Sequence, residues 1–213
     1  INKITNLDYS GKELVDYFLD YNACMNSESY NYAERGSKVK FNMSLRPGLN
    51  FSSMSIEHGQ FEVSNRDFGS ELGFRMGLEA EVVLGFNKNK WALLIEPTYQ
   101  SFSSEKDGVV VDYTSLEIPF GIRHYMFLDD SSKFFVNALY MFDLPLGESI
   151  ITRKPKQPLE VGGGNHMALG VGYTFADRYT LELRYFAREV LPDYSFWQSD
   201  YKTFSVIFGW RVF

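Results

Sequence analysis

Arginine and glutamate are the side chains with the clearest chemical potential in this sequence, because both recur at alternate positions of long amphipathic segments. The arginines are Arg46, Arg75, Arg123, Arg184, Arg188 and Arg211. The glutamates are Glu71, Glu79, Glu81, Glu96, Glu117 and Glu182. A planar guanidinium pairs with a carboxylate through parallel hydrogen bonds, and either charge is costly to bury alone. We therefore predict that these residues form a paired ion network inside the protein.

Histidines are the other candidates for chemistry, as general acids or bases. His58 falls in a predicted loop, His124 lies on the apolar face of its segment, and His166 begins a segment. No spacing of Ser, Asp or Glu around them fixes a nucleophile–base pair. The single cysteine, Cys24, excludes a disulfide framework and a CxxC metal site. We predict no catalytic residue, no metal site and no cofactor.

Strict alternation of apolar and polar residues defines the elements that must position these charges. In "ELGFRMGLEAEVVLGF", residues 71–86, every even-numbered position is apolar, whereas the odd-numbered positions are mostly Glu, Arg and Gly. Successive side chains of a strand point to opposite faces, so this segment is a long strand between two different environments. The pattern recurs in residues 39–51, 91–99, 116–122, 134–142, 167–175, 179–185 and 204–212.

The connections between these eight segments alternate in length. "NKNK", "FLDDSSK" and "ADR" are short, whereas the longest connection runs from about residue 146 to 165 and contains "RKPKQPLEVGGGN". An even number of strands with short turns at one end and long loops at the other is typical of an outer-membrane barrel. We predict an all-β fold, an eight-stranded antiparallel up-and-down transmembrane β-barrel.

A soluble barrel with its apolar face inside also fits simple alternation. Three features favour the membrane form: glycines lie on the polar face, that face carries balanced Arg and Glu, and aromatics mark the ends of the apolar face. The aromatic girdle near the short turns comprises Phe86, Trp91, Phe134, Tyr173, Phe175, Tyr179 and Trp210. A second row near the long loops comprises Phe51, Tyr99, Tyr140, Phe142 and Tyr185.

The N-terminal residues 10–25 predict a helix, because Ser10 and Glu13 form a capping box. Its apolar stripe consists of Leu14, Phe18, Tyr21 and Met25. We predict a periplasmic helical segment over residues 1–36 and a barrel over 37–213. We favour docking of the stripe on a protein over binding to the inner leaflet, because the helix is more acidic than basic.

The C-terminal residues "SVIFGWRVF" predict the closing strand, which must pair with the first strand because an open edge in lipid leaves backbone groups unsatisfied. The predicted signal for the barrel-insertion machinery is Phe208, Trp210, Val212 and Phe213. Phe213 is out of phase with the outward-facing even positions. Either a bulge shifts the end of the strand, or Phe213 tucks under the barrel floor.

Several segments resemble the outer-membrane β-barrel domain proteins of Bacteroidota, which are porin-family-like: "FNKNKWALLIEPTYQ", "LEIPFGIRHYMFLDDSSKFFVNA" and "YTLELRYFAREVL". The resemblance covers about residues 38–213. It implies an eight-stranded outer-membrane barrel with a larger N-terminal region, of which residues 1–36 would be the remaining part. It carries no motif that assigns a reaction.

The composition narrows the function further. A formal net charge of -6 argues against a nucleic-acid partner. We predict a non-catalytic protein of the cell outer membrane, with periplasmic termini, extracellular long loops and a lumen closed by charged side chains. Its role would be a membrane anchor or an interaction subunit with outer-membrane or periplasmic partners, in contact with outer-membrane lipid. The alternatives are a small porin-like channel and a lipid-modifying enzyme.

Overall fold

The computed structural model describes residues 8, 10–26, 38–59, 66–106, 109–146, 150–153, 156–160, 164–189 and 197–213. The chain divides into two units, Ile1–Lys38 and Val39–Phe213. The first contains helix α2 (Gly11–Cys24), which is capped by Ser10, whose Oγ accepts the Glu13 N–H at 3.3 Å. The Glu13 carboxylate accepts the Asp8 N–H at 2.8 Å, two residues before the position that a capping box predicts.

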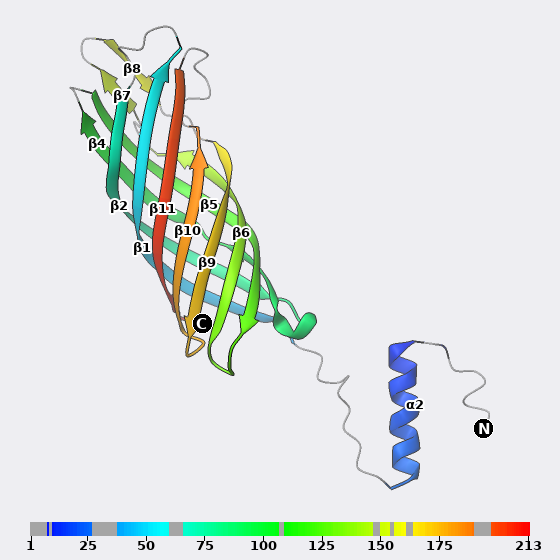
Figure 1. Ribbon diagram of the computed structural model, residues 1–213. Coiled ribbons are helices and arrows are strands. Elements are labelled where there is room, and N and C mark those ends of the chain that lie inside the picture. The colour runs from blue at the N-terminus through cyan, green and yellow to red at the C-terminus, as the bar shows by residue number, and fades with distance from the viewer. Residues whose placement is uncertain are drawn as a thin grey trace. The chain divides into compact units, whose positions relative to one another are not determined.

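Antiparallel strands make up the second unit (Figure 1). They are β1 (Lys40–His58), β2 (Arg66–Val83), β3 (Trp91–Ile95), β4 (Thr98–Lys106), β5 (Val109–Phe127), β6 (Lys133–Pro145), β7 (Ile150–Arg153), β8 (Lys156–Glu160), β9 (Asn165–Phe175), β10 (Tyr179–Arg188) and β11 (Trp197–Arg211). A short 3-10 turn, η2 (Asn87–Asn89), connects β2 to β3. Among the described residues, no helix is long and apolar enough to cross a membrane.

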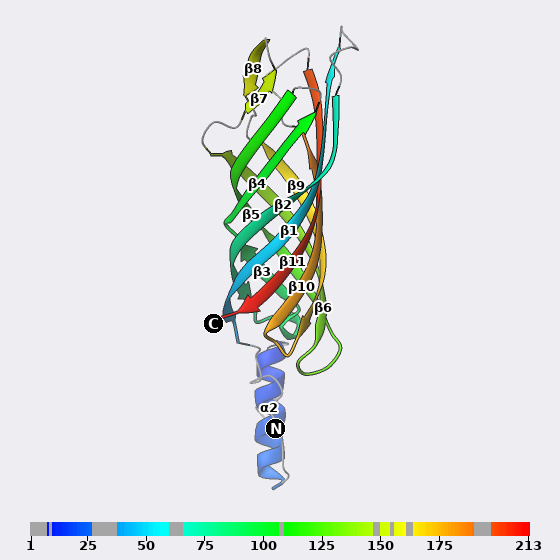
Figure 2. The same ribbon diagram turned by 90° about the vertical axis from the view of Figure 1, so that its left-hand side faces the viewer.

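The strands close into a ring because β1 pairs with both β2 and β11. The ring has eight positions, held in order by β1, β2, β3 with β4, β5, β6, β9, β10 and β11 (Figures 1 and 2). Every pairing around it is antiparallel, from Ser44 opposite Arg211 to Phe134 opposite Tyr173. The predicted eight-stranded antiparallel barrel is therefore confirmed.

Two features depart from the predicted segments. One predicted strand is divided into β3 and β4 at Glu96 and Pro97, because proline has no N–H to donate to the ladder. The ladder nevertheless continues, since the Leu78 N–H donates to the Pro97 carbonyl at 3.0 Å. The predicted loop 146–165 contains the hairpin β7–β8, and β7 extends the sheet by pairing with Val109–Asp112 of β5.

A bulge in β2 separates two kinds of barrel interior. The register with β1 shifts between Ser53 and Ser55, where β2 carries one residue more than β1, and Gly69 there has φ +72°. Only glycine adopts this left-handed conformation without strain. On the side of the short turns, Glu71 and the odd positions after it face inward, whereas beyond the bulge Phe68 does. The bulge therefore lets the strand change from a charged to an apolar inner face without breaking the wall.

The interior of the barrel is layered along its length. At the short turns it is closed by an apolar cluster of Val83, Ala92, Tyr125 and Phe135. At the long loops it is filled by a larger apolar cluster whose members include Met54, Ile56, Phe68, Phe102 and Val111. On β5 the charged side chains Glu117 and Arg123 lie between Tyr113 of the larger cluster and Tyr125 of the smaller one, whereas on β6 Asp143 follows Met141 of the larger cluster.

Candidate functional site in the barrel lumen

Glu96 joins two arginines at the centre of the lumen. It sits at the break between β3 and β4, and its side chain is fully buried. Arg75 of β2 donates to its Oε1 from Nη2 at 2.6 Å, and Arg184 of β10 donates to its Oε2 from Nη2 at 2.7 Å. Both guanidinium groups are at most 1% exposed. One carboxylate thus connects opposite arcs of the barrel wall through charge-assisted hydrogen bonds.

Glu182 makes a second bridge beside the first. Arg184 donates to its Oε1 from Nε at 2.8 Å, and Arg46 of β1 donates to its Oε2. Arg184 therefore binds Glu96 and Glu182 at the same time. Five alternating charges therefore cross the lumen as a continuous series of ion pairs, in the order Arg75, Glu96, Arg184, Glu182 and Arg46.

Arg123 of β5 organises the part of the network nearer the short turns. Its Nη2 donates to Glu79 at 2.7 Å, and its Nη1 donates to Glu81 at 3.1 Å. Asn137 of β6 accepts from its Nε at 2.8 Å, so every nitrogen of this guanidinium has an acceptor. The guanidinium also lies 4.3 Å from the ring centroid of Phe135, in the apolar cluster below.

Glycines on the inner face make room for these long side chains. A Cβ added to Gly209 would lie 3.0 Å from Nη1 of Arg46, and one added to Gly48 would lie 3.1 Å from Cγ of Arg75. A Cβ at Gly77 would lie 2.8 Å from Oε1 of Glu96. Such contacts are tighter than ordinary packing, so the glycines and the charges are fitted to one another.

The structure places the other predicted members of the network differently. Arg188 pairs with Asp143 at 2.6 Å. Glu71 is half-buried and accepts from the Ser104 hydroxyl at 3.0 Å. Glu117 is buried and accepts from Gln100 at 2.6 Å. Within the described part of the chain, Glu71, Glu117 and Arg211 make no ion pair, so three of the twelve predicted residues lie outside the paired network.

Sequence reasoning also missed inward-facing residues that complete the lumen. Asp143 is 4% exposed, accepts from the Tyr113 hydroxyl and forms an ion pair with Arg188. A layer of uncharged groups lies beside it: Asn50 donates to Gln100 at 2.7 Å and accepts from Ser205 at 2.7 Å. Strand parity was the signal that could have found them. Asn50 lies on the same face of β1 as Arg46, and Asp143 lies on the same face of β6 as Asn137. The predicted network was limited to Arg and Glu, so it did not include Asn50 or Asp143.

The predicted girdle residues face outward at the short-turn end. Phe86, Phe134, Phe175, Tyr179 and Trp210 are exposed, and Trp91 and Tyr173 are partly exposed. Neighbouring strands pair their rings, with centroids 5.1 Å apart for Phe134 and Tyr173. His124 joins this row through an edge contact with Trp91 at 4.5 Å.

The C-terminal residues form a bulge. The N–H groups of Val212 and Phe213 both donate to the Met43 carbonyl, at 2.8 and 3.3 Å, and the Met43 N–H donates to the Phe213 carbonyl at 2.8 Å. Val212 and Phe213 thus both lie opposite Met43, and this extra residue turns the last side chain to the outer face. Phe213 is accordingly 73% exposed, with its ring 6.4 Å from that of Phe41. Of the two arrangements considered from the sequence, the structure has the bulge.

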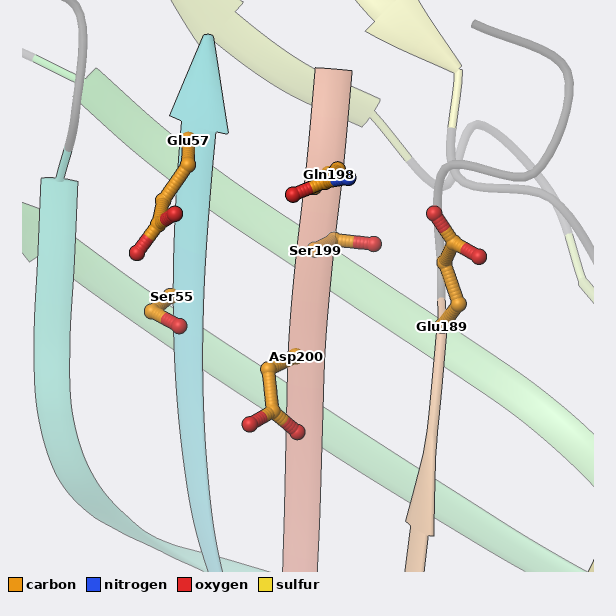
Figure 3. A pocket seen from close by; sticks show the side chains of 6 residues that line it. All are labelled: Ser55, Glu57, Glu189, Gln198, Ser199 and Asp200. Carbon is orange, nitrogen blue, oxygen red and sulfur yellow. The ribbon is translucent and has the colours of Figure 1, made fainter. Parts of the chain in front are cut away.

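A shallow hollow lies on the outer wall near the long loops (Figure 3). Its lining comprises Ser55 and Glu57 of β1, Gln198, Ser199 and Asp200 of β11, and Glu189 after β10. Asp200 pairs with Lys202 at 2.5 Å. The described residues contain no group of three or more side chains suited to hold a metal ion.

The histidines are dispersed rather than gathered into a site. His58 is the last residue of β1, not part of a loop as predicted. His166 in β9 faces inward and its ring lies 4.5 Å from that of Phe186. His124 is in the outer aromatic row, so His124 and His166 lie on opposite faces of the wall.

Comparison with known proteins yields distant structural likenesses. Ail, the attachment invasion locus protein of Yersinia pestis, in complex with the heparin analogue sucrose octasulfate, is 14% identical with a TM-score of 0.43; the match covers 81% of this chain and 99% of that one. Neisserial surface protein A is 11% identical with a TM-score of 0.45, over 80% of this chain and 97% of that one. No protein-family model and no curated protein matches the chain. The resemblance to Bacteroidota proteins stays a prediction, and neither neighbour's ligand nor its role extends to this chain.

Proposed function

We propose that this chain is an outer-membrane barrel with a closed lumen, and that it acts as a membrane anchor or interaction subunit. The observation that carries the proposal is the combination of an apolar outer band with an interior filled by paired charges. A soluble barrel has the opposite arrangement, with its apolar residues inside and its charges in water.

The height of the outer band fits a membrane. On β1 the outward side chains from Phe41 to Phe51 are apolar, and on β2 those from Leu72 to Val82 are. Each run covers ten residue steps, or roughly 33 Å along a strand at ~3.3 Å per residue. With a strand tilt of about 40°, this gives roughly 25 Å along the barrel axis. That is the height of the apolar band of outer-membrane barrels.

The filled interior supports an anchor over a channel. An eight-stranded barrel is just wide enough for its own side chains to fill. Here Arg46, Arg75, Arg123 and Arg184 cross that space and are at most 3% exposed. Apolar clusters close the lumen on both sides of them. Ions would have to break several charge-assisted bonds to pass.

The wall beyond the apolar band supports an interaction role. β1 continues from Phe51 to His58, and β5 begins at Val109, seven residues before Leu116. Most outward groups on these extensions are polar, such as Ser53, Ser55 and Glu57 of β1 and Asp112 of β5, which accepts from Ser103 of β4 at 2.8 Å. Figures 1 and 2 show these strands rising toward the hairpin β7–β8. We place this end outside the cell, where the extended wall offers a rigid surface.

The termini supply two further contacts in this proposal. The helix stripe of Leu14, Phe18, Tyr21 and Met25 would dock on a periplasmic protein, since Phe18, Tyr21 and Met25 are more than half exposed. The outward row of Phe208, Trp210, Val212 and Phe213 would be read by the barrel-insertion machinery. Both assignments rest on exposed apolar side chains, which mark interaction sites when they are grouped.

One purification with two readouts tests the proposal. The protein is isolated from its native membrane in mild detergent, its stoichiometric partners are identified, and the same material is added to a planar bilayer. We expect at least one co-purifying protein and no stable conductance steps. Matched material carrying Arg184→Ala and Arg46→Ala removes part of the ionic closure, and it should still show no steps if the apolar clusters on both sides close the lumen as well.

Stable conductance of the unmodified protein would contradict a closed lumen and favour the porin-like alternative. Elution without any partner under all mild conditions would contradict the interaction role. Mass spectrometry of lipid A from cells with and without the protein addresses the enzyme alternative, and a changed acylation pattern would support it.

A further inference from the structure

Among the described residues, Glu117 differs from every other carboxylate buried in the lumen. Its side chain is 1% exposed, and its only hydrogen bond from a side chain nitrogen of the described residues comes from Gln100 Nε2, at 2.6 Å to Oε1. Each of the others has a cation within ion-pair distance. Those acids and their nearest arginines are Glu79 and Glu81 with Arg123, Glu96 with Arg75 and Arg184, Glu182 with Arg46 and Arg184, and Asp143 with Arg188.

The sheet register places a second carboxylate next to Glu117. Glu117 of β5 is directly opposite Asp143 of β6, and both side chains face inward. Directly opposed residues of antiparallel strands have Cβ atoms about 4.5–5.5 Å apart, and like charges in this position repel. Asp143 uses Oδ2 to accept from the Tyr113 hydroxyl and to form an ion pair with Arg188, whereas its Oδ1 is buried and has no hydrogen-bond partner among the described residues. The structure thus leaves a buried acceptor opposite an unpaired acid.

The charge balance of the lumen points to the same place. Of the side chains that the structure describes, the buried arginines are Arg46, Arg75, Arg123, Arg184 and Arg188, which makes five positive charges. The buried acids of the lumen are Glu79, Glu81, Glu96, Glu117, Asp143 and Glu182, which would make six negative charges if all were ionised. Buried Lys133 does not correct the difference, because it pairs with Asp177 in the turn after β9 at 3.0 Å. One uncompensated charge in a low-dielectric interior costs several kcal/mol unless a proton or cation neutralises it.

The groups that face Glu117 come from every surrounding strand. Gln100 approaches from β4 and Asp143 from β6. Arg75 of β2 and both Arg184 and Arg188 of β10 act on it electrostatically, but each of these arginines is already committed to Glu96, Glu182 or Asp143. Tyr113 of β5 and Tyr201 of β11 complete the surroundings. None of these groups leaves a spare positive charge for Glu117.

We propose that the Glu117–Asp143 pair is a proton-binding site, in which Glu117 is held as a neutral carboxylic acid. The proton supplies the donor that Asp143 Oδ1 lacks, while the Glu117 carbonyl oxygen accepts from Gln100. The lumen then contains five positive and five negative charges. The site lies where the ionic layer meets the amide layer, so its proton keeps two opposed carboxylates together in the folded wall.

Linkage gives the sign of the expected pH dependence. In the unfolded chain Glu117 ionises near pH ~4.3, whereas the folded barrel keeps its proton to higher pH. The folded state then binds more protons, so its stability falls as pH rises above that range. Glu117→Gln removes this loss, because a carboxamide accepts from Gln100, donates toward Asp143 and does not titrate. The matched control, Glu182→Gln, removes a charge that two arginines need, so its effect has the opposite sign.

The experiment measures thermal unfolding midpoints of the full chain in detergent micelles from pH 4 to pH 8. We expect Glu117→Gln to equal the unmodified protein near pH 4 and to exceed it increasingly above, by roughly 3–5 °C for each pH unit. Glu182→Gln should lose stability throughout the neutral range. Infrared spectroscopy of the unmodified protein should show a protonated carboxyl band at pH 7 that Glu117→Gln lacks.

Three results would overturn the proposal. The first is a loss of stability in Glu117→Gln at neutral pH that matches Glu182→Gln. The second is a thermal unfolding midpoint of the unmodified protein that depends on whether Na⁺, K⁺ or Ca²⁺ is present, together with loss of that dependence in Glu117→Gln. This result would mean that a cation, and not a proton, occupies the site. The third result is the absence of a protonated carboxyl band at pH 7 in the infrared spectrum of the unmodified protein. This measurement decides the question if Glu117→Gln does not fold.

Discussion

At the scale of single residues, Arg184 joins the two carboxylate bridges of the ion network. Its guanidinium donates to Glu182 at 2.8 Å and to Glu96 at 2.7 Å, and it is fully buried. Replacement of all partners of a buried ion pair by apolar residues of similar shape can leave the stability unchanged. Removal of Arg184 alone, however, leaves buried carboxylates that water cannot solvate. The penalty therefore comes from the two carboxylates left behind.

We expect Arg184→Met to lower the free energy of unfolding by about 3–5 kcal/mol. The matched control is Lys202→Met, which removes a cation from Asp200 in a pair that is about half exposed. Exposed pairs contribute about 0–1 kcal/mol, so the control should change little. Urea unfolding in lipid vesicles, followed by tryptophan fluorescence, measures both. Equal effects of the two variants would show that the lumen is hydrated enough to solvate its charges.

At the scale of elements, the alternation of the sequence was sufficient to predict eight barrel positions and the direction of each face. The even positions of residues 72–86 and of 204–210 point outward as expected. The hairpin β7–β8 was not predicted, because "RKPKQP" contains two prolines and has no alternating face.

The candidate site was predictable only in part, for a related reason. Parity shows which side chains enter the lumen, but the choice of partner depends on how strands are staggered around the ring. Arg184 and Glu96 are 88 residues apart and lie on strands that are not neighbours. Glu117 has the same residue type and parity as Glu79, yet its neighbour across the ladder is Asp143, and none of the described arginines forms an ion pair with it.

The close approach of β5 and β6 at Gly121 predicts that a larger residue there destabilises the barrel. A Cβ on Gly121 would lie 2.1 Å from the Ala138 carbonyl oxygen and 2.9 Å from the Leu139 Cα, which are both backbone atoms. Backbone cannot rotate away as a side chain end can, so Gly121→Ala should force the two strands apart. We expect a loss of about 1–3 kcal/mol in unfolding free energy.

The control for this prediction is Gly164→Ala, whose added Cβ would meet only ordinary contacts at 3.8 Å and beyond. Heat-modified migration on gels reports the folded fraction of each variant, and urea titration reports its stability. A Gly121→Ala barrel as stable as Gly164→Ala would mean that β5 and β6 are not as closely paired as the structure shows.

At the scale of the whole barrel, the seam between β1 and β11 joins the first and last strands of the wall. The register is constant from Ser44 opposite Arg211 to His58 opposite Trp197, and its only interruption is at Arg46 and Pro47, where proline has no N–H to donate. The bulge at Val212 and Phe213 ends this seam with an outward aromatic. The seam thus joins the two end strands by backbone hydrogen bonds over most of their length, as a sheet without an open edge in lipid requires.

The depth of the apolar band gives the last prediction, which uses the three tryptophans of the chain. A variant with Trp91→Phe and Trp197→Phe keeps only Trp210, which faces outward at the short-turn end of the band. Adding Trp210→Phe and Leu78→Trp moves the single probe to the middle of the band on β2, where Leu78 is outward and exposed. In vesicles of lipids brominated at different depths, Trp210 should be quenched most by bromine near the headgroups. The Leu78→Trp probe should be quenched most by bromine near the chain ends, because about half the band height separates it from either interface. Equal quenching of both probes at every depth, or no quenching of either, would mean that the apolar band does not lie across a bilayer and would remove the basis of the membrane assignment.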